Sequence, residues 1–152
     1  MQNSDKSQVP LSTVGMLIYA PAAHQVLLVK SHKWNHLYTV PGGKVQLGES
    51  CLEAAIREVQ EETALQVTNV HFAMLQEAIY SDQFWKKKHL IMHDFVGELL
   101  PSCDLQDVKL NDEAEEFIWV SPFEANQLNL AKETQALVQW FVINYFKHRG
   151  IT

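Results

Sequence analysis

Cysteine is scarce in this sequence of 152 residues, in which Cys51 and Cys103 are the two examples. Two cysteines do not make a disulfide framework, and neither lies in the CxxC or cysteine–histidine spacing of a zinc site. We therefore predict two free thiols, as is usual for a protein of a reducing compartment.

Long apolar runs are also missing, and no stretch is long enough to cross a bilayer. The first residues, MQNSDKSQVP, are polar and lack the basic-then-apolar order of a signal peptide. We expect a cytoplasmic protein with no membrane partner. The expected organisation is a flexible tail over residues 1–10 followed by one domain over residues 11–152, a length sufficient for a full hydrophobic core.

Positive charge is the third deficit, because 12 lysines and arginines face 18 acidic residues and give a net charge of −6. The short run Lys86-Lys87-Lys88 is the one basic cluster in the sequence. Proteins that wrap DNA or RNA usually present a basic face, so we do not expect a nucleic-acid polymer as partner. A small phosphorylated substrate fits if another group neutralises its charge. A homodimer remains an open option for the oligomeric state.

Strand and helix signals alternate along the chain in a way that predicts an α/β fold. Apolar, β-prone segments cover residues 12–20, 25–31, 67–80, 89–99 and 116–120, with a short strand before the glycines in LYTVPGG (37–43). A brief helical turn is expected after Ser121-Pro122, and a closing helix over residues 130–150. This order suits a mixed sheet with helices on both faces.

One helix is expected to begin after Ser50, because Glu53 follows at the spacing of a capping box. An apolar stripe with helical spacing should pack on the core; its members are Leu52, Ala55, Ile56 and Val59. On that basis an aspartate at Ile56 should unfold the domain. Glu58, Glu61 and Glu62 share a second face beside the stripe.

Three carboxylates on one helical face offer the hard oxygen ligands that Mg²⁺ and Mn²⁺ prefer. The alternative is a solvated acidic face, and glutamate is common on helices. Gly42 and Gly43 precede the helix and allow close backbone approach to a ligand, which favours the metal site.

The segment from Gly43 to Leu65 resembles the Nudix box, GX5EX7REUXEEXGU, in which U is a bulky aliphatic residue. The matching positions are Gly43, Glu49, Arg57, Glu58, Val59, Glu61, Glu62 and Leu65. Ala64 stands where the pattern has glycine, which usually closes the helix at positive φ. The chain is thus similar to Nudix hydrolases of the MutT type. The resemblance implies an α/β/α sandwich and Mg²⁺- or Mn²⁺-dependent hydrolysis of a nucleoside diphosphate linked to a moiety X.

The resemblance also implies roles for single residues. Glu58, Glu61 and Glu62 would bind the metal together with the Gly42 carbonyl. Arg57 would orient the glutamates, and Glu49 would brace the loop or contact a second metal. An extra carboxylate near residue 116 would act as ligand or base; we rank Glu116 first, with Glu113 and Glu115 as alternatives, each as readily an acidic loop residue.

Substrate contacts are expected from Gly43 and Lys44 in the glycine loop, from Tyr80, and from the pair Phe84–Trp85 beside the three lysines. An aromatic pair next to positive charge can hold a base and phosphates, although a solvated hairpin tip would show the same residues.

Two other functions compete with hydrolysis. A sensor or scaffold that binds a nucleotide without cleaving it would usually lose box glutamates, and all are present here. A Nudix-fold isomerase would need a catalytic cysteine in a characteristic context, which neither cysteine provides. ADP-ribose and a nucleoside triphosphate, including an oxidised one, are comparable substrate candidates, and the SQPWPFP-like run of the NADH-cleaving subgroup is absent.

Overall fold

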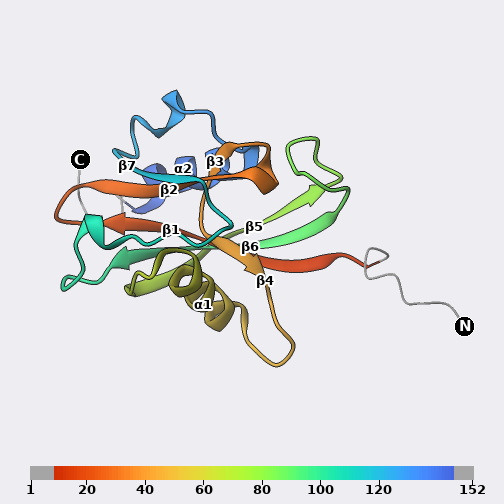
Figure 1. Cartoon of the computed structure of the whole chain (residues 1–152), viewed down its shortest axis with the longest axis horizontal. Coiled ribbons are helices and arrows are strands. Elements are labelled where there is room, and N and C mark those ends of the chain that lie inside the picture. The colour runs from red at the N-terminus through yellow and green to blue at the C-terminus, as the bar shows by residue number, and fades with distance from the viewer. Residues whose placement is uncertain (1–8, 146–152) are drawn as a thin grey trace, which may run out of the picture.

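The computed structural model describes residues 9–145, which form a sheet flanked by helices (Figure 1). The strands are β1 (Leu11–Ala20), β2 (Gln25–Ser31), β3 (Leu37–Thr39), β4 (Gly42–Lys44), β5 (Val67–Ile79), β6 (His89–Leu99) and β7 (Glu116–Val120). The α-helices are α1 (Cys51–Thr63) and α2 (Lys132–Trp140), which continues into a π-helical turn over Phe141–Tyr145. Most of the predicted tail and the end of the predicted closing helix lie outside the described residues.

The sheet is mixed, as the order of elements predicted. Its strands follow the order β3-β2-β1-β6-β5, with β1 and β6 parallel and the remaining pairs antiparallel. β1 changes partner along its length: its first half pairs with β4 at residues 13–15, and its end pairs with β2 at residues 18–20. β7 adds to β2 on the other side. The sheet therefore divides beside β1, which opens a space between β4 and the β2–β3 hairpin.

Helices cover both faces of the sheet, because β1 is buried on both sides. Alternate β1 residues, among them Met16 and Ile18, pack in one core with Ala54, Ala55 and Val59 of α1. The intervening residues Leu17 and Tyr19 pack in a second core with Leu137 and Val138 of α2. The two-residue period of a strand thus supplies both cores from one segment. The predicted α/β/α sandwich is confirmed (Figure 1).

Two further predictions can be compared with the described residues. Cys51 and Cys103 are free thiols, as expected. Within residues 9–145, no helix is both long enough and apolar enough to cross a membrane.

Helix α1 begins as predicted and turns a different face to the core than predicted. The Ser50 hydroxyl accepts from the Glu53 amide, and the Glu53 carboxylate accepts from the Ser50 amide. The predicted apolar stripe is wrong for Leu52 and Ile56, which are both 43% exposed. The buried face instead carries Ala54, Ala55, Glu58, Val59, Glu62 and Thr63. Small alanines bring the helix close to the sheet, and the rotation that buries them moves Leu52 and Ile56 to the flank. An aspartate at Ile56 is therefore not expected to unfold the domain.

Ala64 closes α1 in the left-handed conformation, with φ of 62°, and its amide donates to the Gln60 carbonyl. The chain turns at this residue so that Leu65 is buried and β5 can begin. An L-residue with a Cβ is strained in this region, whereas glycine is not. The departure from glycine thus costs backbone strain and leaves the turn intact.

Replacing Ala64 with glycine should raise the free energy of unfolding by about 1 kcal/mol, because the Cβ strain disappears. Chemical denaturation measures the change. Gly48→Ala is the matched control: Gly48 has φ of 90°, and a Cβ at this position would have nothing within 4 Å, so alanine there should destabilise through the backbone alone. An unchanged or lower stability of Ala64→Gly would contradict the assignment of strain to Ala64.

Candidate functional site

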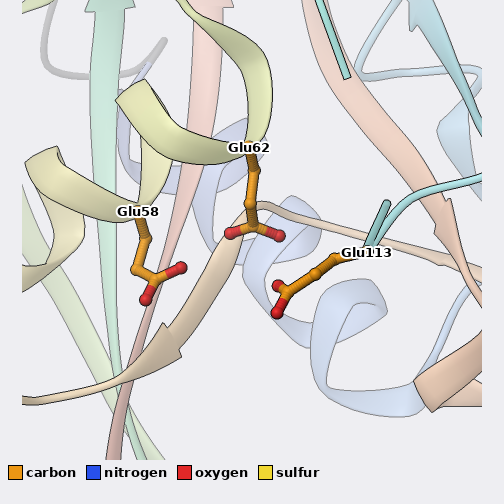
Figure 2. Close-up of side chains that lie close together, drawn as sticks. All are labelled: Glu58, Glu62 and Glu113. Atoms are coloured by element: carbon orange, nitrogen blue, oxygen red, sulfur yellow. The ribbon is translucent and has the colours of Figure 1, made fainter. Parts of the chain in front are cut away.

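Two buried carboxylates of α1 meet a third from the opposite loop. Glu58 and Glu62 lie one helical turn apart on the buried face of α1. Glu113 comes from the loop before β7 and points toward them (Figure 2). Carboxylate oxygens of the three residues lie within 4.8 Å of one another. Within residues 9–145, this is the group of carboxylate, histidine and cysteine side chains close enough to share an ion.

The two glycines of β4 pack directly against the two helical glutamates. The Gly42 amide donates to Glu62 Oε2 at 2.7 Å. A Cβ at Gly43 would lie 2.6 Å from Glu58 Oε1, and a Cβ at Gly42 would lie 2.1 Å from the Val14 carbonyl oxygen. Both positions therefore require glycine, one for the carboxylate above it and the other for the β1 backbone beside it.

Arg57 joins α1 to the loop that precedes it. Its guanidinium donates twice to Glu49, at 2.6 and 3.0 Å, and once to the Lys44 carbonyl at 3.0 Å. It also donates to Glu58 Oε1 at 2.9 Å and to Glu61 Oε2 at 3.1 Å. Hydrogen bonding to Arg57 lowers the pKa of Glu49, and the carboxylates raise the pKa of Arg57. This network fixes the Glu58 carboxylate through a charge-assisted bond.

The carboxylate cluster is electrostatically unfavourable by itself. Burial raises the pKa of Glu62 well above the usual range, and the nearby charges of Glu58 and Glu113 raise it further. The Gly42 amide lowers it in part. A cation bound between these groups would lower their pKa values, because it stabilises the charged carboxylates.

The donor set fits Mg²⁺ or Mn²⁺. All the ligand atoms are carboxylate oxygens, which suit hard cations, and the cluster contains neither sulfur nor imidazole. Glu113 already shares its charge with Lys33, whose Nζ lies 3.0 Å from Glu113 Oε1. Glu58 is held by Arg57, and Glu62 forms no ion pair among the described residues. Because both lie buried on adjacent turns of α1, we expect these two residues to hold the ion.

The other predicted carboxylates lie outside the cluster and pair with basic side chains. The Glu61 side chain is 53% exposed and pairs with Arg57. Glu49 is bound by Arg57 and by the Gln46 amide. Glu116 pairs with Lys30 at 2.8 Å, which lowers the pKa of Glu116. Of the three loop carboxylates considered, Glu113 is the one in the cluster, while Glu115 pairs with His36.

The cluster opens into a cleft of about 530 Å³, located where the sheet divides beside β1. Four of the predicted substrate residues line it, namely Gly43, Lys44, Phe84 and Trp85. Tyr80 is not among the lining residues; it is exposed, and Lys87 lies over its ring.

Aromatic and basic side chains from two loops form part of the cleft wall. Phe84 packs edge-on against Trp34, with ring centroids 4.7 Å apart, and Lys86 lies over the Trp85 ring. The Trp85 amide donates to the Lys33 carbonyl, which ties the β5–β6 loop to the β2–β3 connection. Lys33, Lys86 and Lys88 also line the cleft, and Lys33 pairs with Glu113 of the carboxylate cluster.

Sequence reasoning missed Asp94 and Glu133, which also line the cleft. Asp94 lies on β6 and is 3% exposed; Glu133 lies in the first turn of α2 and is 5% exposed. Burial raises the pKa of Asp94 to about 7, against the opposing hydrogen bond from Gln76. A lone aspartate in the apolar strand HLIMHDFVGEL was the available signal for Asp94. Glu133 carried no comparable signal, because acidic residues are common in a first helical turn.

Comparisons with known proteins agree with this arrangement. The model of the NUDIX domain family matches residues 9–141. The NAD-capped RNA hydrolase NudC of Photobacterium profundum is 28% identical over 145 residues, which cover 91% of this chain and 52% of that protein. The chain thus spans about half the length of this curated relative.

Solved structures share the fold. The E. coli dihydroneopterin triphosphate pyrophosphohydrolase superposes with a TM-score of 0.72 at 20% identity, over 90% of this chain and 99% of that one. A C. elegans Ap4A hydrolase gives 0.67 at 24% identity, over 88% of this chain and 96% of that one.

Glu62→Gln should raise the melting temperature of the metal-free protein and remove most of the increase that Mg²⁺ produces. The amide is uncharged at every pH, so the variant avoids the cost of burying a charge or of taking up a proton on folding, and its side-chain oxygen can still accept from Gly42. Because the folded-state pKa of Glu62 is raised, wild-type stability in EDTA should fall as pH rises from the ordinary glutamate range through that raised value. Thermal melts against pH, in EDTA and in Mg²⁺, measure both effects.

Glu61→Gln is the matched comparison, since the same change is made one position earlier on an exposed side chain. It should leave the metal-free melting temperature and its pH dependence nearly unchanged. A loss of the Mg²⁺-dependent increase as large as that at Glu62 would indicate that Glu61 turns toward the ion when it binds.

Proposed function

Because the chain belongs to the NUDIX domain family, we propose that it is a divalent-metal-dependent hydrolase of the diphosphate linkage in a nucleoside diphosphate derivative. The observation that carries the proposal is the convergence of Glu58, Glu62 and Glu113 on one cleft. Mg²⁺ or Mn²⁺ held there would supply Lewis-acid polarisation of a phosphoryl oxygen.

The remaining groups of the cleft support phosphate binding. Lys33, Lys44 and Lys86 line it and can pair with phosphate oxygens that the metal does not reach. Arg57 is committed to five hydrogen bonds, with Glu49, Glu58, Glu61 and the Lys44 carbonyl, so its role is to hold the metal-binding carboxylate rather than to contact substrate.

A general base is needed to accept a proton from the attacking water. Glu113 belongs to the cluster, and its partly exposed side chain lines the cleft. One of its carboxylate oxygens pairs with Lys33, which leaves the other oxygen to accept a proton. Glu116, the first-ranked residue from the sequence, is held by Lys30 with a lowered pKa, which makes it a weaker base. We assign the base to Glu113 and keep Glu116 as the alternative.

Relatives narrow the chemistry and leave the substrate open. One is named for NAD-capped RNA, one solved structure for Ap4A and another for dihydroneopterin triphosphate. All three names describe hydrolysis of a compound that carries phosphate groups and a heterocyclic base. ADP-ribose and nucleoside triphosphates, including oxidised ones, remain our substrate candidates, with a small molecule favoured over a polymer by the net charge of −6.

A substrate panel with Mg²⁺ tests the function. Nucleoside triphosphates, dinucleotides, NAD and ADP-ribose are incubated with the protein, and phosphate release is read with and without added pyrophosphatase or phosphatase. We expect hydrolysis of at least one class, no hydrolysis in EDTA, and recovery with Mg²⁺ or Mn²⁺. Equal activity in EDTA would reject the metal site. Nucleotide binding without hydrolysis in any arm would instead support a sensor or scaffold.

Glu113→Gln should lower kcat by roughly 10²–10⁴-fold, the usual contribution of general base catalysis, with a smaller effect on the Mg²⁺ concentration at half-maximal rate. Glu116→Gln is the matched control from the same loop and should retain near wild-type kcat. The measurement is kcat against Mg²⁺ concentration for both variants on the best substrate of the panel. The reverse ranking of the two variants would move the base to Glu116.

A further inference from the structure

The cleft contains a second acidic pair outside the metal cluster. Asp94 and Glu133 line the wall that β6 and α2 form, and both are more than nine-tenths buried. Gln76 holds them together: its Nε2 donates to Asp94 Oδ2 at 2.8 Å and to the Glu133 backbone carbonyl at 2.9 Å. Three elements, β5, β6 and α2, therefore fix the position of this pair.

The hydrogen-bonding capacity of the Glu133 carboxylate is not fully used within the described residues. Its Oε1 is buried and has no hydrogen-bond partner among the described residues. A buried carboxylate oxygen without a donor costs free energy, so native proteins rarely keep one unless a ligand completes it. A first-turn glutamate interacts favourably with the helix dipole, but that interaction does not require the side chain to be buried in a cleft.

We propose that Glu133 and Asp94 bind the 2-amino-4-oxopyrimidine edge of a heterocyclic base, the edge that guanine and pterins share. This proposal deepens the proposed function and rests on it for the presence of a nucleotide-like ligand in the cleft. A carboxylate accepts from two neighbouring donors, and this edge presents an amino group beside a ring N–H. Adenine, cytosine and uracil each place an acceptor next to their donor instead.

Asp94 complements the remaining group of that edge. The oxo group beside the ring N–H needs a donor, and a protonated carboxyl supplies one. The pKa of Asp94 is raised to about 7 by burial, and the charge of Glu133 contributes in the same direction. One carboxylate that accepts and one carboxyl that donates then match the full donor–donor–acceptor edge.

The rest of the cleft is consistent with a base on this wall. Trp34, Phe84 and Trp85 line the same space and offer apolar ring surface for stacking. A cleft of about 530 Å³ has the size of a typical small-molecule site, with room for a base on one wall and phosphates at the carboxylate cluster. Among the substrate candidates, this pairing favours guanine-type bases over the adenine of ADP-ribose.

Binding without turnover tests the proposal independently of hydrolysis. Isothermal calorimetry with GMP, IMP and AMP compares the full edge, the edge without the amino group, and the adenine edge. GMP should bind about 10- to 100-fold more tightly than IMP, the value of the one hydrogen bond from the amino group to a charged carboxylate. Neopterin against guanosine then distinguishes a pterin from a purine ligand, and preference for either supports the shared edge.

Glu133→Gln should reduce the preference for GMP over IMP to about 3-fold or less, because the amide replaces one acceptor by a donor. Glu133→Ala, which removes both acceptor oxygens, is a second variant, should Glu133→Gln fail to fold. Glu98→Gln is the matched control: Glu98 is also a buried carboxyl of β6, bonded to Asn69 and outside the cleft lining. It should retain the preference for GMP.

Tighter binding of AMP than GMP, or equal binding of all three nucleotides, would overturn the proposal even if the protein proves to be a hydrolase. Retention of the GMP preference in both Glu133→Gln and Glu133→Ala would overturn it as well. Conversely, GMP selectivity that these variants remove would support base recognition even if the substrate panel showed no hydrolysis.

Discussion

Mutual repulsion of buried carboxylates is the constraint on which this structure depends. Glu58 and Glu62 are drawn into the protein beside Glu113, although burial and like charge both oppose it. Groups in that position stay together only if the backbone holds them there. The capping box fixes where α1 begins, the glycines of β4 leave room under the carboxylates, and Arg57 holds the side of the cluster. The glycines and Arg57 would be unnecessary in a helix that merely covered a sheet.

Arg57 shows how one side chain serves both the fold and the site. It bridges the loop at Glu49, the β4 end at the Lys44 carbonyl and the Glu58 carboxylate. Its guanidinium presents donors in a fixed fork, which lysine does not offer. The position of Glu58 is therefore coupled to the loop that enters α1. Glu61 accepts from the same guanidinium nitrogen as Glu58 and lies on the exposed side of the helix.

Local rules predicted the elements of this fold well because local chemistry dominates them. The Ser50–Glu53 pair sets the start of α1, and the apolar segments become β1, β2 and β6 nearly residue for residue. Helical spacing alone misplaced Leu52 and Ile56, since the rotation of a helix is set by what it packs against. The choice among Glu113, Glu115 and Glu116 depended on the path of a loop, and the partners Lys33, His36 and Lys30 lie about 80 residues away in sequence. Asp94 and Glu133 meet only in the tertiary structure, so no spacing rule could pair them.

The metal cluster and the Asp94–Glu133 pair differ in the kind of ligand that each suits. At the metal cluster, negative charge gathers where a cation is needed to bring an anionic phosphate to an acidic protein. At the second group, Gln76 bonds to the Asp94 carboxyl and to the Glu133 backbone carbonyl, and the raised pKa of Asp94 lets one of the two carboxyls be neutral near pH 7. A neutral carboxyl beside a charged one is suited to hydrogen bonding with an uncharged heterocycle and less suited to holding a divalent ion. One cleft can thus direct phosphates to the metal cluster and a base to Asp94 and Glu133.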